Sequence, residues 1–378
     1  MDFLSSHSIA PSKVVRGEHA WEESYQLIPT ICRRPLLLGR SNTTAELRQG
    51  LAHKLQEIGL KNVSAELKHD CCEADLKRLK TIACNNSCDG VIASGGGKVL
   101  DAGKLLAHRL EIPCITVPLS AATCAGWTAL ANIYSSAGAF QRDEVLNKCP
   151  ELIIFDHSFV RQAPPRTLAS GIADALAKWY EASVSSGSSK DGLIQQAVQM
   201  ARVLRDQLLI DGPKALQDQN SHAWIRVAEA CALTAGLIGG IGGARCRTVA
   251  AHAVHNGLTQ LEACHEMLHG EKVGYGILVQ LRLEEMIGGN QLAGQARRQL
   301  LPFLQKLELP VSLEDLGLSK VSLFELKEVC QFACQEDSDL HHLPFTVTPS
   351  SLLEALVAAG KDEPVIIESK NTEKSRAS

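Results

Sequence analysis

The sequence has little that would direct it to a nucleic acid, a membrane or an oxidising compartment. Of its 378 residues, 38 are Lys or Arg and 42 are Asp or Glu, which gives a formal net charge of -4. This balance offers no basic surface for nucleic acid or anionic lipid. We find no run of about 18 apolar residues, and residues 1–24 lack the apolar core of a signal peptide. We therefore expect small-molecule partners, no nucleic acid, no membrane and a cytoplasmic location.

Aromatic residues are scarce, at 4%, whereas cysteine is abundant. The 13 cysteines are scattered and form no CxxC pair. Because their number is odd, they cannot all form disulfides within one chain. Only Cys71 and Cys72 are adjacent. We expect reduced thiols, most of them small core residues.

The chain is long enough for two domains. Up to about residue 160, short apolar runs such as GVIASGGG, PCITVPL and ELIIFD alternate with helical patterns, which is typical of a parallel sheet covered on both faces. After PPRTLASG the pattern changes to long amphipathic segments. We predict an α/β domain over 1–162 and an all-helical domain over 163–378.

A glycine-rich segment, SGGGKVLDAGK (94–104), follows a predicted strand and opens a predicted helix. Without side chains, Gly95, Gly96 and Gly97 let the backbone approach a pyrophosphate, whose charge meets free N–H groups at the helix N-terminus. We expect Asp101 in the first helical turn, where it opposes the helix dipole. The segment matches neither GxGxxG nor a Walker loop. It predicts a phosphate cradle, with a plain strand-to-helix turn as the alternative.

Three side chains in separate motifs offer ligands for one divalent cation: Asp174 in GIADALAKWYEA, His252 in AAHAVHNGL and His269 in LHGEK. Two imidazoles and one carboxylate leave a coordination position open, as a catalytic metal requires. His255 lies one helical turn after His252 and is a candidate for carrying a proton. The alternative for each histidine is a buried position without metal.

The run HEMLH (265–269) also spells a zinc-peptidase motif, with His265 and His269 as ligands and Glu266 as general base. Gly270 follows at once, and we expect it to end the helix at the second ligand. A peptidase also has no need of a phosphate cradle. We expect His269 alone to take part, and keep a peptidase as an alternative.

Four segments in this order, GVIASGGGKVLDAGK, GIADALAKWYEA, AAHAVHNGLT and LHGEKVGYGILVQL, resemble the glycerol dehydrogenase branch of the iron-containing (group III) alcohol dehydrogenases. The similarity extends from about residue 35 through HHLP (341–344). It implies a dinucleotide-binding α/β half and an all-helical half, with the active site in the cleft between them. It also implies a homo-oligomer.

The resemblance implies site residues as well. A divalent metal, most often zinc and otherwise iron, would be held by Asp174, His252 and His269. The residues expected to touch the cofactor phosphates are Gly97 and Lys98, and those expected beside the nicotinamide are Thr128, Leu130 and Tyr134.

One departure from the branch concerns the substrate. Glycerol dehydrogenases carry a substrate-contacting aspartate where this chain has Cys124, in PLSAATCAGWTAL. A carboxylate suits a polyol but repels an acid at close range, so its absence argues against glycerol. The segment resembles the A type of hydroxycarboxylate dehydrogenase, which reduces 2-oxo acids. This implies a 2-oxo acid near Cys124 and Trp127, with interface packing as the alternative for Trp127.

A second departure, Arg40 in LLLGRSN, concerns the cofactor. Related dehydrogenases often carry an acidic residue here that binds the adenosine ribose, whereas an arginine pairs with a 2′-phosphate. We expect NADP(H) to be preferred over NAD(H), with a solvated surface arginine as the alternative.

These features predict reversible hydride transfer between NADP(H) or NAD(H) and a small 2-oxo or 2-hydroxy acid, with a metal polarising the carbonyl and His255 passing the proton. A glycerol or vicinal-diol dehydrogenase shares every motif and stays open. An enzyme like dehydroquinate synthase needs several Lys and Arg around a substrate phosphate, and we identify none near the metal motifs. A nucleotide-binding protein without catalysis would not need the metal trio.

Overall fold

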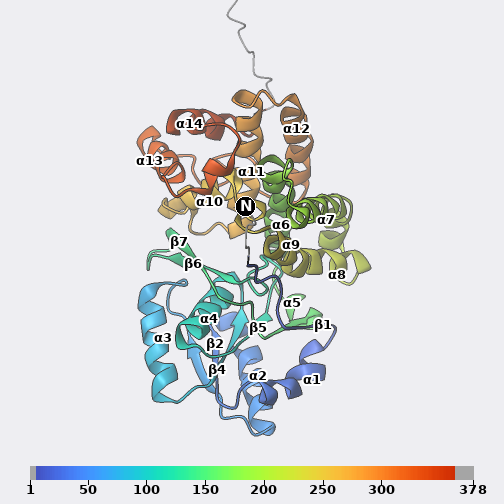
Figure 1. Ribbon diagram of the computed structural model, residues 1–378, viewed down its shortest axis with the longest axis vertical. Coiled ribbons are helices and arrows are strands. Elements are labelled where there is room, and N and C mark those ends of the chain that lie inside the picture. Colours follow the sequence, from blue (N-terminus) through green and yellow to red (C-terminus); the bar gives the residue numbers. More distant parts are fainter. Residues whose placement is uncertain (1–5, 362–378) are drawn as a thin grey trace, which may run out of the picture.

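The structure, a computed structural model, describes residues 6–361 and has two domains (Figure 1). The first contains a parallel β-sheet between helices and ends with the short helix α5 (His157–Val160). The second begins at α6 (Pro165–Ser186), and in the described residues it is built of helices alone. The expected fold class, an α/β domain followed by an all-helical domain, is confirmed.

The main sheet has six parallel strands in the order β1-β8-β5-β4-β2-β3. Every residue of β2, β4, β5 and β8 is buried, as their runs of Val, Ile and Leu predict for a sheet covered on both faces. In such sheets ligands bind beyond the carboxyl ends of the strands. The strands are β1 Lys13–Gly17, β2 Pro35–Gly39, β3 Val63–Glu66, β4 Gly90–Gly95, β5 Cys114–Pro118 and β8 Leu152–Asp156.

Successive strand residues point to opposite faces of the sheet, and each face has its own core. Leu37 packs in the cluster that includes α1 (Ala20–Ser24) and α2 (Ala45–Glu57). Its neighbours Leu36 and Leu38 pack in the cluster that includes α3 (Glu73–Asn85) and α4 (Gly97–Leu110). The two helix pairs therefore bury opposite faces and leave the carboxyl edge of the sheet uncovered.

The sequence patterns do not predict β1, α1 or the antiparallel hairpin of β6 (Leu130–Tyr134) and β7 (Phe140–Val145). Strand β1 is a partly exposed edge strand of five residues, paired in parallel with β8. In β7 the central residues Gln141, Arg142 and Asp143 are exposed, so no alternation of apolar and polar residues marks it as a strand.

The helical domain is organised around α6 and α11, which pack against each other (Figure 1). Gly270 lies in the first turn of α11, where an added Cβ would be 1.8 Å from the Ser170 carbonyl oxygen of α6. The helix thus begins at His269, and the expectation that Gly270 ends a helix is wrong. The helices after α6 are α7 Gly192–Gln217, α8 His222–Glu229, α9 Ala235–Gly242, α10 Ala250–Leu258, α11 His269–Met286, α12 Gln291–Lys306, α13 Leu323–Ala333 and α14 Pro349–Ala358.

One helical stretch of the described chain, His222–Gly242, is long and apolar enough to cross a membrane by length and composition. It comprises α8, a π-helical turn (Ala230–Thr234) and α9. Of its most apolar window, 61% is buried inside the protein, which is typical of a core helix. All 13 cysteines lie in the described residues, and none forms a disulfide.

Candidate active site

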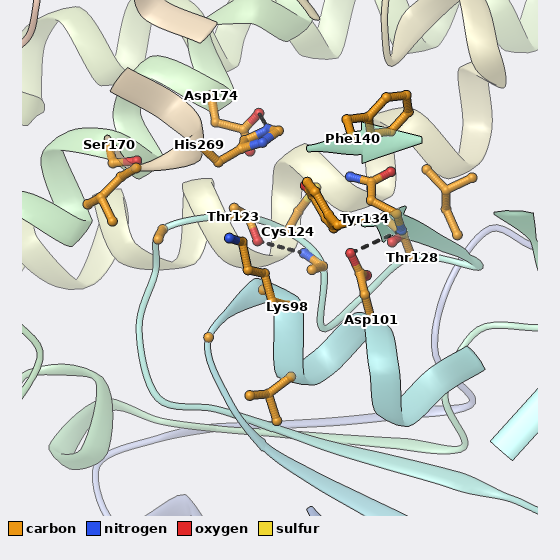
Figure 2. A pocket seen from close by; sticks show the side chains of 18 of the residues that line it. Lys98, Asp101, Thr123, Cys124, Thr128, Tyr134, Phe140, Ser170, Asp174 and His269 are labelled. Carbon is orange, nitrogen blue, oxygen red and sulfur yellow. Dashed lines mark hydrogen bonds and ion pairs between the residues drawn. The ribbon is translucent and has the colours of Figure 1, made fainter. Parts of the chain in front are cut away.

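A cavity of about 980 Å³ lies where the two domains meet. Its walls include Gly95–Gly97 from the carboxyl edge of the sheet and Asp174, His252 and His269 from the helical domain. Figure 2 shows Asp174 and His269 on the side opposite Lys98 and Cys124. The cavity therefore joins the predicted phosphate cradle to the predicted metal ligands.

The glycine segment forms a tight turn between β4 and α4. An added Cβ on Gly95 would lie 2.8 Å from Val99 Cβ, and one on Gly97 would lie 3.0 Å from Thr123 Oγ1. Gly96 is the N-cap of α4 and lines the cavity together with Gly95 and Gly97. The first turn of α4 thus presents its free N–H groups to the cavity, an arrangement that suits a pyrophosphate.

Asp101 does not lie in the first turn of α4, contrary to our expectation. It is the fifth residue of the helix and is buried, with a carboxylate oxygen 3.1 Å from Lys104 Nζ. Lys104 Nζ also donates to the Thr128 carbonyl, at 3.0 Å, and to that of Leu130. The pair therefore fixes β6 to α4, so that Asp101, Thr128 and Leu130 all line the cavity.

Arg40 and Lys98 line the cavity and share one partner, Asp70. Burial opposes ionisation of Asp70, but the ammonium of Lys98 and the guanidinium of Arg40 outweigh it and hold the pKa of this carboxyl below its ordinary value. The Lys98 ammonium also lies 5.2 Å from the centre of the Tyr134 ring. Arg40 is therefore not a freely solvated arginine, because Asp70 ties it to the cradle.

The three predicted metal ligands come together from α6, α10 and α11. Asp174 Oδ1 lies 3.3 Å from His252 Nε2 and 3.5 Å from His269 Nε2. Asp174 and His252 are buried, and His269 is partly exposed toward the cavity. Burial opposes ionisation of Asp174, yet hydrogen bonds with the two imidazoles hold its pKa well below the ordinary value. This acidic oxygen between two imidazoles fits a divalent cation.

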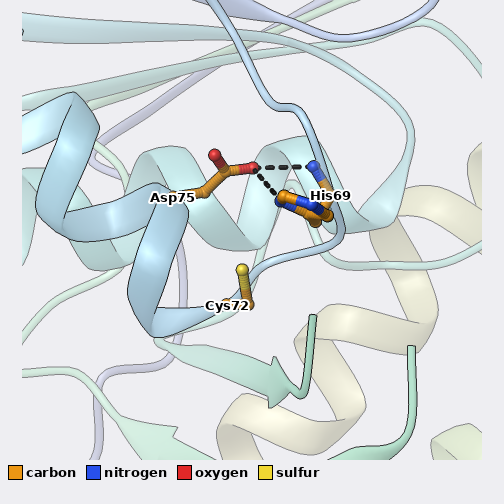
Figure 3. A group of neighbouring side chains, drawn as sticks. All are labelled: His69, Cys72 and Asp75. Atoms are coloured by element: carbon orange, nitrogen blue, oxygen red, sulfur yellow. Dashed lines mark hydrogen bonds and ion pairs between the residues drawn. The ribbon is translucent and has the colours of Figure 1, made fainter. Parts of the chain in front are cut away.

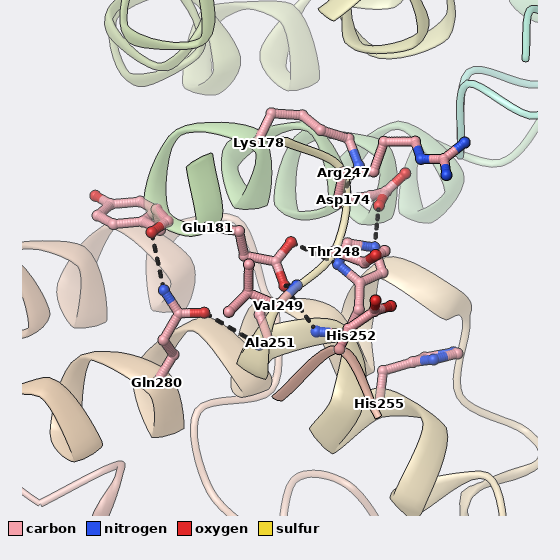
Figure 4. Close-up of polar contacts among 12 residues, drawn as sticks. Asp174, Lys178, Glu181, Arg247, Thr248, Val249, Ala251, His252, His255 and Gln280 are labelled. Carbon is pink, nitrogen blue, oxygen red and sulfur yellow. Dashed lines mark hydrogen bonds and ion pairs between the residues drawn. The ribbon is translucent and has the colours of Figure 1, made fainter. Parts of the chain in front are cut away.

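Behind His252, a buried polar network fixes the ligand (Figure 4). Glu181 accepts hydrogen bonds from the backbone N–H of Val249, at 2.6 Å, and of His252, at 3.0 Å. Its other oxygen is 2.7 Å from His252 Nδ1. Gln280 accepts from the Ala251 N–H at 3.2 Å. With Nδ1 bound to Glu181, the ring presents Nε2 to the metal position.

Charge around His252 reflects the same network. Burial lowers the pKa of His252, but the charge of Glu181 and hydrogen bonds to Asp174 and Glu181 raise it to about 9. For His269, burial outweighs the attraction of Asp174 and the pKa is lowered. Without a metal ion, protonated His252 balances the negative charges of Asp174 and Glu181 beside it. A bound cation would supply this positive charge in place of the proton.

His255 does not line the cavity. It is buried, its ring centre is 4.2 Å from that of His269, and its Nδ1 is 2.9 Å from Asn256 Oδ1. Burial and the neighbouring His269 hold the pKa of His255 well below its ordinary value. Asn256, the hydrogen-bond partner of His255, lines the cavity. The proton-carrying role of His255 stays a prediction.

The peptidase reading of HEMLH is wrong. Residues 265–268 are not helical, so His265 and His269 do not share a helix face, as that motif requires. His265 Nε2 instead lies 3.0 Å from the Thr259 carbonyl oxygen. The reason given from sequence, a helix that ends at Gly270, was nevertheless incorrect, because α11 begins at His269.

Of the two predicted substrate residues, Cys124 lines the cavity and Trp127 does not. Trp127 is 8% exposed, and its Nε1 donates to the Ile9 carbonyl at 3.0 Å. An added Cβ on Gly236 of α9 would lie 2.6 Å from Trp127 Cβ. The ring thus packs between the domains, and the expectation that it touches the substrate is corrected.

Four residues of the site were missed by the sequence reasoning: Glu181, Asp70, Lys178 and Arg247. Lys178 and Arg247 both line the cavity near the metal ligands. Our statement that no Lys or Arg gathers near the metal motifs is therefore wrong. Lys178 stands in the quoted segment GIADALAKWYEA, four residues after Asp174, and that spacing on one helix face was the available signal.

A second group of possible metal ligands, His69, Cys72 and Asp75, gathers at the start of α3 (Figure 3). One Asp75 oxygen accepts from the backbone N–H groups of Lys68 and His69, at 2.7 and 2.8 Å, and the other pairs with Arg78 at 2.8 Å. Because both oxygens are already bonded, this group is explained by closure of the loop that carries Asp70.

The family model described as iron-containing alcohol dehydrogenase matches residues 11–157. An uncharacterised oxidoreductase of Synechocystis sp. is 50% identical over 95% of this chain and 93% of its own length. Hydroxycarboxylate dehydrogenase A of Escherichia coli is 35% identical over 75% of this chain and 78% of its own length.

Among solved structures, glycerol dehydrogenase from Schizosaccharomyces pombe is similar with a TM-score of 0.82 and 29% identity, covering 93% of this chain and 89% of that one. Sequence relatives and fold thus agree with each other. The chain belongs to the iron-containing alcohol dehydrogenase family.

Proposed function

We propose that this oxidoreductase transfers a hydride between NADP(H) or NAD(H) and a small 2-oxo or 2-hydroxy carboxylic acid. The observation that carries the proposal is the single cavity shared by the cradle Gly95–Gly97 and the ligand set Asp174, His252 and His269. When bound, the nicotinamide supplies the hydride and a divalent cation, zinc or iron, polarises the substrate carbonyl. The protein holds the two reactants together and excludes water from the space between them.

Residues near the metal ligands support an acid as substrate. Burial raises the pKa of the Cys124 thiol to about 11, so this position carries no negative charge at neutral pH. An anionic substrate therefore meets no repulsion from it. The similarity to hydroxycarboxylate dehydrogenase A of Escherichia coli points in the same direction.

NADP(H) is the proposed preferred cofactor because Arg40 lies at the cavity wall beside Ser41 and Thr43. A guanidinium flanked by two hydroxyl groups suits a phosphate. Asp70 competes for the same guanidinium, which limits the preference and leaves NAD(H) as a usable cofactor.

The proton that accompanies the hydride is assigned, as part of this proposal, to His255, which would pass it through water or the ribose hydroxyls while Asn256 orients its ring. A neutral imidazole can accept a proton at one nitrogen and release one at the other. Replacement of His255 by Gln tests this role: we expect a lower kcat and an altered pH profile, and an unchanged rate and pH profile would remove His255 from the mechanism.

A glycerol or vicinal-diol dehydrogenase is the second candidate, favoured by the similarity to the Schizosaccharomyces pombe glycerol dehydrogenase. Absorbance at 340 nm separates the two. NADPH and, separately, NADH are mixed with purified protein and 2-oxobutanoate, 2-oxoglutarate or dihydroxyacetone, before and after chelation and after return of zinc or iron. Oxidation of NADPH by an oxo acid, lost on chelation and restored by metal, supports the proposal. Activity on dihydroxyacetone alone supports the second candidate.

A cytoplasmic location and a homo-oligomeric state stay predictions. Light scattering coupled to gel filtration measures the second of them directly.

A further inference from the structure

The cations that line the cavity fall into two groups. Arg40 and Lys98 pair with Asp70, and Arg142 pairs with Glu73. For Lys178 and Arg247, no carboxylate of the described chain lies within ion-pair distance. Among the described residues, these two cavity-lining side chains thus form no ion pair of their own, although the charge of Lys178 acts on Asp174.

Lys178 lies one helical turn after Asp174 on α6 and is 4% exposed. Its Nζ donates to the Arg247 carbonyl oxygen at 3.0 Å (Figure 4). An ammonium has three protons, and this is the one hydrogen bond found for it among the described residues. A buried ammonium is costly unless it is paired, so the remaining donors point to an anion that is part of the working enzyme.

Arg247 precedes α10 and packs over Gly239 of α9, where an added Cβ would lie 2.7 Å from Arg247 Cγ. Its Nε is buried and has no hydrogen-bond partner in the described part of the chain. Buried polar groups are nearly always bonded in native proteins, and an orphan of this kind needs an explanation. A guanidinium matches a carboxylate with two parallel hydrogen bonds.

We propose that Lys178 and Arg247 form a subsite for the substrate carboxylate, and that this subsite selects 2-oxo and 2-hydroxy acids over uncharged ketones and polyols. The inference rests on the proposed function. A helical turn advances about 5.4 Å, so Lys178 and Asp174 lie about one turn apart on the same face of α6. A small substrate is long enough to span that separation. The carbonyl and carboxylate oxygens of a 2-oxo acid are on adjacent carbons and reach both positions at once. A polyol has no charge to offer this pair.

The test compares two substrates of equal carbon count, 2-oxobutanoate and 1-hydroxy-2-butanone, which differ in a carboxylate against a hydroxymethyl group. Zinc-loaded enzyme is assayed as the wild type and as the Lys178→Met, Arg247→Met and Arg247→Lys variants. The matched control is Arg245→Met, which removes an exposed arginine two residues away on the same segment. A charge-assisted hydrogen bond contributes about 1.5–3 kcal/mol, so each Met variant should raise the KM for 2-oxobutanoate about tenfold or more.

For 1-hydroxy-2-butanone, the kcat/KM of each Met variant should stay within about threefold of the wild type, because this substrate has no carboxylate that the removed cation would bind. Arg247→Lys should regain most of the affinity for the acid. Calorimetry with oxidised cofactor and 2-oxobutanoate gives a Kd without turnover, and this Kd should follow the KM. Thermal unfolding midpoints identify any variant that fails to fold.

The outcomes separate the two proposals. If the wild type reduces 2-oxobutanoate while the Met variants lose both substrates equally, or lose neither, the subsite is overturned and the proposed function stands. If the wild type reduces only 1-hydroxy-2-butanone, the acid as substrate and the subsite both fall. If no cofactor is oxidised with either substrate, the proposed function fails first.

Discussion

The two walls of the cavity are built on different principles. On the helical side, Asp174 and His252 are buried, and Glu181 behind them is 0% exposed and accepts three hydrogen bonds. On the α/β side, the side chains of Arg40 and Lys98 are 41% and 44% exposed and share one carboxylate. One wall is fixed before any ligand arrives, and the other is charged and partly solvated.

This difference follows from what each wall has to bind. A metal ion needs ligand atoms held within tenths of an ångström, so its ligands are fixed by buried partners. A nucleotide is large and makes many contacts, so its phosphates can be held by backbone N–H groups and long side chains. Substitution of a metal ligand or of Glu181 should therefore weaken metal binding, while substitution of Arg40 on the α/β wall should change cofactor selectivity.

The largest effect is expected from the loss of a metal ligand. Asp174→Ala removes the carboxylate between the two imidazoles, and activity should fall about 10³-fold or more, because metal stabilisation of the reacting oxygen contributes several kcal/mol. Metal content by mass spectrometry should fall with it. His265→Gln is the control, since that histidine bonds to a backbone carbonyl outside the site. Full activity in Asp174→Ala would refute the metal site.

Glu181→Gln tests how far the hydrogen-bond network behind His252 contributes to metal affinity. The amide would turn an N–H toward His252 Nδ1, so the ring would keep its proton on Nε2, where the metal should bind. Metal affinity should weaken 10- to 100-fold, as is typical when such a partner is removed. Competition with a chelator of known affinity gives the Kd. An unchanged Kd would limit Glu181 to a role in folding.

How far the sequence could predict this site depends on which wall a residue belongs to. The metal ligands were identified because each stands in a recognisable helical motif. Helices α6 and α11 pack closely because Gly270 has no side chain. The sequence reasoning placed this glycine at the end of a helix, whereas it lies at the start of one. The four strands in which every residue is buried were predicted, whereas β7, with a charged and exposed centre, was missed.

Contacts between residues far apart in the chain could not be predicted from the sequence. Glu181 contacts His252 across 71 residues, and Lys98 meets Asp70 across 28. No periodicity records such a contact, because it depends on how helices and loops pack and not on local spacing. Trp127 is a similar case: its position beside Cys124 suggested the substrate, whereas the partner of its N–H is the Ile9 carbonyl, 118 residues away.

On the α/β wall, Arg40→Asp should change selectivity and leave catalysis in place. The charge reversal removes the proposed partner of the 2′-phosphate and adds repulsion, so the Kd for NADPH should rise about tenfold relative to that for NADH. Fluorescence titration of both cofactors measures the ratio. Lys61→Asp makes the same charge change at an exposed position of this domain and serves as the control. A ratio that stays the same in Arg40→Asp contradicts the assignment.

The smallest effect is expected at Glu284, which lies at the far end of the hydrogen-bond network behind His252. Gln280, which bonds to the Ala251 N–H, also donates to Glu284 Oε1 at 3.2 Å, and Glu284 bonds to Asn290 at 3.3 Å. Burial raises the pKa of Glu284 from 4.5 to about 7, despite hydrogen bonds from both amides. A carboxyl group this far from the ligand should affect stability and not metal affinity.

The sign of the effect follows from the protons bound in each state. Between pH 4.5 and about 7 folded Glu284 keeps a proton that the unfolded chain has released, so its contribution to stability falls as pH rises through this window and is constant above it. Glu284→Gln removes this loss. Its free energy of unfolding should exceed that of the wild type by about 3 kcal/mol at pH 8 and match it near pH 4.5. Urea unfolding at both pH values measures the difference, and chelator competition should show an unchanged metal Kd. A weakened Kd would instead extend the metal-positioning network from Glu181 as far as Glu284.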